Sequence, residues 1–115
     1  MCNMAVQDTA TWIFIKEAIQ LLCKRHEDRR VNAHWGFIEW GKTGKGYVWT
    51  VCDGVSIGYG RHCTIRVEGR DDFPPITVYG HSGPSEGYTE VDLTDPKWTL
   101  ETFADLLAIK CQLEG

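Results

Sequence analysis

The segment GFIEWGKT, residues 36–43, matches the phosphate-binding pattern G-x-x-x-x-G-K-[ST] at every fixed position. In a nucleotide-binding loop, small residues let backbone N–H groups curl around a phosphate at the start of a helix. Here the variable positions hold bulky side chains and a carboxylate, namely Phe37, Ile38, Glu39 and Trp40. The glycines and the run YVWTV that follow predict a turn and a strand, whereas the motif requires a helix. We therefore expect no nucleotide site.

Four histidines and five cysteines are the other residues with metal-binding or nucleophilic chemistry. No two histidines have the i, i+4 spacing of a helical metal site, and there is no C-x-x-C pair, so we expect no metal, cofactor or disulfide. The residue types do allow Cys63 as a nucleophile beside His62 and His81. A small ligand-binding or hydrolytic domain is therefore the alternative to our main expectation, which is that the protein is not an enzyme.

Charge is distributed unevenly along the chain. Its net value is −4, but residues 1–70 hold ten Lys/Arg against seven Asp/Glu, and residues 71–115 hold two against nine. Direct nucleic-acid binding is not expected, because such binders present a basic face. The segment SEGYTEVDLTD and the helix predicted after it gather carboxylates around one tyrosine: Glu86, Tyr88, Glu90, Asp92, Asp95, Glu101 and Asp105. We expect these residues to bind a basic partner, with a solvated strand edge and helix face as the alternative.

The elements that must position these residues follow from the apolar periodicity. A period near 3.6 predicts a helix over residues 9–26, capped by Asp8 or Thr9, and a second helix beginning at Asp95-Pro96 or at Thr99. Between them, alternating runs separated by glycine-rich turns predict four or five strands, including 62–68, 76–81 and 88–93, with a loop at 82–87. We expect one α+β domain over residues 1–115: a mainly antiparallel sheet with both helices on one face.

The first hairpin carries most of the aromatic side chains. A turn centred on Thr43 and Gly44 would pair residues whose numbers sum to 87. Trp40 would then face Tyr47, and Ile38 would face Trp49. That face, with Val51, is the expected core. Trp35 and Phe37 would then lie on the face away from the helices as a docking patch, unless the N-terminal helix covers them.

These features favour a protein-binding module. The chain has no secretory signal pattern and no membrane-spanning run, so we expect a cytoplasmic protein that does not contact membranes. Size, acidity and the lack of a catalytic motif are similar in general character to phage anti-CRISPR and other anti-defence inhibitors, and to bacterial toxin-immunity proteins. That resemblance implies a small acidic inhibitor that blocks the basic surface of a nucleic-acid-handling partner. A homodimer, joining the basic and acidic parts of two copies, is also considered.

Overall fold

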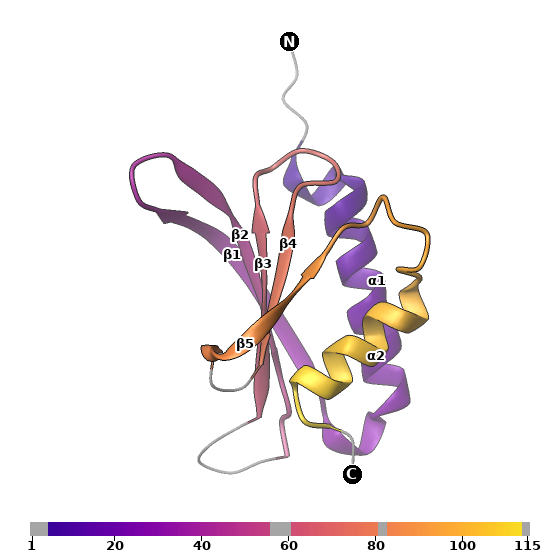
Figure 1. The fold of residues 1–115 in the computed structure, drawn as a ribbon. Helices are drawn as coiled ribbons and strands as arrows, with labels where there is room; N and C mark the ends of the chain where they lie inside the picture. The colour runs from indigo at the N-terminus through magenta and orange to yellow at the C-terminus, as the bar shows by residue number, and fades with distance from the viewer. Residues whose placement is uncertain (1–4, 56–60, 81–82, 114–115) are drawn as a thin grey trace.

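The chain folds as a five-stranded antiparallel sheet with two helices against one of its faces (Figure 1). This computed structural model describes residues 5–55, 61–80 and 83–113, the side chains of residues 83–86 excepted. The strands lie side by side in chain order. In sequence the elements are η1 (Val6–Asp8), α1 (Ala10–Arg25), η2 (Glu27–Arg29), β1 (Asn32–Trp40), β2 (Gly44–Cys52), β3 (His62–Glu68), β4 (Ile76–Gly80), β5 (Gly83–Val91) and α2 (Leu100–Lys110). The predicted α+β architecture is confirmed.

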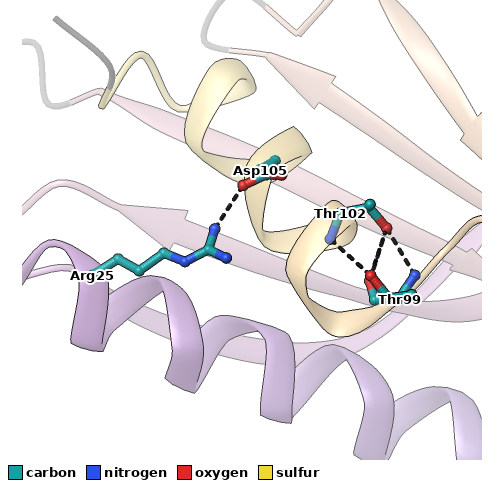
Figure 2. Close-up of polar contacts among 4 residues, drawn as sticks. All are labelled: Arg25, Thr99, Thr102 and Asp105. Carbon is teal, nitrogen blue, oxygen red and sulfur yellow. Dashed lines mark hydrogen bonds and ion pairs between the residues drawn. The ribbon is translucent and has the colours of Figure 1, made fainter.

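Threonine side chains set the start of both helices. Thr9 precedes α1, and its hydroxyl oxygen accepts the N–H of Trp12 at 3.2 Å, which selects Thr9 over Asp8 as the cap. Thr99 precedes α2 and forms a reciprocal capping box with Thr102, in which each hydroxyl accepts the other residue's backbone N–H (Figure 2). Asp95 instead accepts the N–H of Lys97 at 3.1 Å in the turn before the helix, so the second predicted start is the correct one.

The core lies between the helices and one face of the sheet. Alternation along each strand sends every second side chain toward the helices, where apolar residues bury large areas. The strands contribute Tyr47, Trp49, Val51, Cys63, Ile65, Val67, Ile76 and Val78, and the helices contribute Ile15, Ile19, Leu22, Phe103 and Leu107. In the described part of the chain no helix covers the opposite face, which carries Arg66, Tyr79 and Tyr88 and is called the open face below.

The register of the first hairpin differs from the predicted one. Trp40 pairs with Gly44, and Trp35 pairs with Trp49, so partner numbers sum to 84 and not to 87. The turn is shorter than expected because Gly41 adopts a left-handed φ of 61° and residues 41–43 close the hairpin. The register differs from the expected one by three residues. Because side chains alternate between the two faces of a strand, this odd shift moves each β1 side chain to the opposite face from the one expected relative to β2.

This shift corrects the expected docking patch. Trp35 lies on the helix-covered face, where its ring packs edge-on against Trp12 of α1 at a centroid distance of 5.7 Å. Phe37 lies on the same face and remains 56% exposed, with the guanidinium of Arg70 over its ring at 4.4 Å. The two aromatics therefore do not form a patch opposite the helices. The alternative expectation, cover by the N-terminal helix, holds for Trp35, which is partly buried and packs against α1.

Two other segments bear on the predictions. The segment 36–43, which matches the phosphate-binding pattern, forms the end of β1 and the turn before β2, as predicted. The predicted loop at 82–87 is wrong for residues 83–87, which belong to β5. Gly83 pairs with Gly80 of β4, and the register shift before the Tyr79–Tyr88 pair leaves residues 84–87 without a β4 partner, as in a bulge of an edge strand, where glycine and proline are tolerated.

Candidate functional site

A groove of about 650 Å³ opens on the open face over β3, β4 and β5. Its floor is formed by Thr77 and Tyr79 of β4, and one side by Arg66 and Glu68 of β3. The other side is the end of β5 and the residues after it, with Tyr88, Glu90 and Asp92. Strand alternation explains the grouping, because directly paired residues of neighbouring strands share a face.

The side chain of Arg66 is held between two aromatic rings. Its guanidinium lies 5.1 Å from the ring of Trp40 and 5.6 Å from the ring of Tyr79. One nitrogen also pairs with Glu68 at 2.7 Å. Trp40 comes from β1 and reaches β3 because its indole occupies the space where a side chain at Gly44 of the intervening strand β2 would stand. A planar cation stacked on rings and bonded to a carboxylate is thus already part of this surface.

The β5 side of the groove presents an aromatic ring and a carboxylate. Tyr88 pairs with Tyr79 across the ladder, with ring centroids 6.0 Å apart, and is 56% exposed. Glu90 pairs with Thr77, which in turn pairs with Arg66 on β3. Glu90 is exposed, and within the described residues its carboxylate forms no hydrogen bond or ion pair. Both side chains are therefore available to a ligand.

Asp92 adds a second carboxylate to this side. Its Oδ1 accepts the hydroxyl of Thr94 at 2.5 Å and the backbone N–H of the same residue at 2.9 Å. The hydrogen bond from the Thr94 hydroxyl has the larger effect and the one from the backbone N–H the smaller, and both lower the pKa of Asp92 from its usual value. The carboxyl group is therefore ionised at neutral pH. The groove then holds one arginine against three carboxylates, a net charge of −2.

The end of the groove is closed by the β3–β4 loop with Phe73, Pro74 and Pro75. This loop is tied to the start of α1, since Asp72 Oδ1 accepts the N–H of Ala10 at 2.5 Å and the N–H of Phe73 donates to Thr11 Oγ1 at 2.9 Å. Phe73 itself has a φ of 57°, which side-chain-bearing residues rarely adopt. The helix thus fixes the position of the loop that bounds the groove.

The structure divides the predicted acidic surface into two parts. Tyr88, Glu90 and Asp92 meet at the groove. Glu101 and Asp105 lie on α2, across the sheet from it, and Asp105 is paired with Arg25 of α1 at 2.6 Å (Figure 2). The remaining members are Asp95, which is half-buried in the turn before α2, and Glu86, whose side chain lies outside the described residues.

The predicted site lacked most of the groove lining, including Arg66, Glu68 and Tyr79, and it lacked Trp40, which stacks on Arg66. The alternation of HCTIRVE already placed Arg66 and Glu68 on the polar face of their strand, and that was the available signal. Trp40 could not be found in the same way, because the wrong hairpin register assigned it to the core.

The alternative site is not assembled by the described residues. His62 and Cys63 are consecutive in β3 and so point to opposite faces, and His81 lies outside the described residues. Cys63 is fully buried, and a hydrogen bond with the Cys111 thiol, together with burial, raises its pKa well above the usual value. A thiol in that state is a poor nucleophile.

Two features are lacking from the described ranges, a cluster of metal-binding side chains and a helix of membrane-spanning length. There, no group of three or more His, Cys, Asp or Glu side chains is arranged to hold a metal ion. Neither α1 nor α2 is long and apolar enough to cross a membrane.

Comparisons with protein-family models, with curated proteins and with solved structures gave no match. The geometry of the groove is therefore the basis for a functional proposal.

Proposed function

We propose that the protein is a non-enzymatic binding module, a small acidic inhibitor whose open face docks against the basic surface of a partner protein. The observation that supports this is the groove on that face, where Tyr88, Glu90 and Asp92 line one side and the net charge is −2. The carboxylates supply complementarity to a basic partner, and the aromatic rings supply area that becomes buried on docking.

The partner class follows from the charge. A basic surface that accepts carboxylates is also the kind of surface that binds nucleic-acid phosphates. A module that covers it would compete with nucleic acid, which is how an inhibitor of the anti-CRISPR, anti-defence or toxin-immunity type would act. Surface carboxylates act at a distance and mainly raise the association rate, so the interaction should weaken with salt.

The division of the acidic residues gives a test with an internal control. The variant Glu90→Lys/Asp92→Lys reverses two charges at the groove, and Glu101→Lys/Asp105→Lys makes the same change of net charge on α2. Pull-downs from host lysate, with bound proteins identified by mass spectrometry, would supply a partner. Association and dissociation rates of the purified partner would then be measured for both variants at low and high salt.

We expect the groove variant to slow association at least about tenfold at low salt, because two attractive charges become repulsive. The α2 variant should associate at nearly the wild-type rate. Equal binding by the groove variant, or loss of binding only in the α2 variant, would show that the groove is not the docking surface. Analytical ultracentrifugation of the free protein distinguishes a partner from self-association into the homodimer considered above.

A further inference from the structure

We infer that the groove recognises an arginine side chain, presented by a short extended segment of the partner, which stacks on Tyr88 and pairs with Glu90. This inference rests on the proposed function, since it specifies the chemical group that the same groove receives. The inference is more specific than the proposed function, because a basic partner surface could also bind the groove through lysine side chains or through its overall charge.

The open face itself shows how it holds a guanidinium. Arg66 is stacked by Trp40 at 5.1 Å and by Tyr79 at 5.6 Å, and Glu68, two residues along the same strand, binds it at 2.7 Å. The combination is a ring that covers the flat face of the cation and a carboxylate at its edge. Both contacts suit the planar, forked guanidinium better than the compact ammonium of lysine.

The strand β5 repeats this combination without a cation. Tyr88 and Glu90 lie two residues apart on β5 and share the open face, since they pair with Tyr79 and Thr77, whereas the ring and carboxylate groups around Arg66 come from different strands. The exposed fraction of Tyr88 is 56%, and within the described chain the carboxylate of Glu90 has no hydrogen-bond or ion-pair partner. One ring and one carboxylate therefore lie ready on the groove's outer side, complementary to an added guanidinium.

The shape of the groove selects the presentation of that arginine. The groove runs between β3 and β5 and is bounded at one end by Phe73, Pro74 and Pro75. A strand or a polyproline-like segment is narrow enough to lie in such a channel and to project one long side chain onto β5, and aromatic-lined grooves commonly accept extended peptides.

The test uses two blocked heptapeptides of glycine and serine with one central residue, arginine in the first and lysine in the second. Each is titrated into the ¹⁵N-labelled full chain and followed by NMR. We expect the arginine peptide to shift the amide signals of Tyr79, Tyr88 and Glu90, and to bind about threefold or more tightly than the lysine peptide.

Three variants sharpen the result. Tyr88→Leu keeps an apolar side chain but removes the ring, so it should bring arginine binding down to the lysine level. Glu90→Gln should weaken both peptides. Phe37→Leu is the matched control, because Phe37 is also 56% exposed but lies on the helix-covered face, and it should change neither affinity.

The outcomes separate this inference from the proposed function. Equal affinity for the two peptides, lost in Glu90→Gln, overturns the arginine inference and leaves charge-based docking in place. Absence of shifts at the groove, or an arginine preference that survives Tyr88→Leu, also overturns it. Failure of the proposed function would appear elsewhere, as unchanged partner association in the Glu90→Lys/Asp92→Lys variant.

Discussion

The indole of Trp40 lies over Gly44, its partner in the β1–β2 ladder, in the space that a Cβ at Gly44 would occupy. The same indole stacks on Arg66. The absence of a side chain at this β2 position is thus what lets a β1 residue reach across to β3.

Three glycine-to-alanine substitutions test this packing. At Gly46 a Cβ would collide with the backbone carbonyl of Val67, so Gly46→Ala should lower the free energy of unfolding by about 2–3 kcal/mol. Gly44→Ala should cost less, about 1 kcal/mol, because the indole can move aside. Gly36→Ala is the control, since apart from its chain neighbours no residue has an atom within 4 Å of the Cβ position. Urea denaturation measures all three, and a loss at Gly36 equal to that at Gly46 would contradict the steric explanation.

Two Arg–Asp pairs of nearly equal length should contribute differently to stability. Asp53 has a fully buried side chain and binds Arg29 at 2.7 Å, whereas Asp105 is 61% exposed and binds Arg25 at 2.6 Å. Asp53→Ala leaves a half-buried arginine without this carboxylate and removes the acceptor for the N–H of Val55, so a loss of about 3 kcal/mol is expected. Asp105→Ala should cost under about 1 kcal/mol. Thermal or urea unfolding of the two variants decides the ranking.

The hydrogen bonds from Thr94 should make Asp92 a reporter of acid sensitivity. They lower the pKa of Asp92 in the folded chain, so its stabilising contribution is present above the unfolded-state pKa and is lost as the pH falls through the folded value. A ¹³C NMR titration should place the carboxyl below 3.8, and Thr94→Ala should move it back toward that value. An unchanged titration in Thr94→Ala would mean that another group holds the pKa down.

Tyr47 should limit stability at high pH. Burial raises the pKa of Tyr47 to about 12, so the neutral phenol favours the folded state. Its contribution is complete below the ordinary value of 10.0 and disappears as the pH rises through about 12. Tyr47→Phe should flatten the fall in unfolding free energy between those two pH values. Circular dichroism during an alkaline titration measures the difference.

The apolar periodicity of the sequence predicts which elements form, but it does not decide whether α2 starts at Asp95 or at Thr99. Spacing predicted the two helices and the antiparallel strands, because each element buries one face and repeats its apolar side chains with its own period. It left two possible starts for α2, since both offer a capping side chain. The reciprocal bonds of Thr99 and Thr102 decide between them in the folded chain.

The hairpin register shows what periodicity leaves open. β1 has aromatic side chains on both faces, with Trp35 and Phe37 on one and Trp40 on the other, so its own pattern does not select the face that turns inward. The turn makes that choice through the left-handed conformation of Gly41. The groove could not be predicted for a related reason, because its members come from three strands and the β3–β4 loop, and only the pairing of those strands brings them together.

The single-sided arrangement of the core has a consequence for how such a protein diverges. Tyr88, Glu90 and Asp92 are exposed on the face opposite the buried side chains that α1 and α2 cover. Replacing them changes which partner is selected while removing little of the apolar burial that drives folding. Partner specificity can therefore change by substitution more readily than the fold. A library randomised at these three positions should yield mostly folded proteins with altered partner preference.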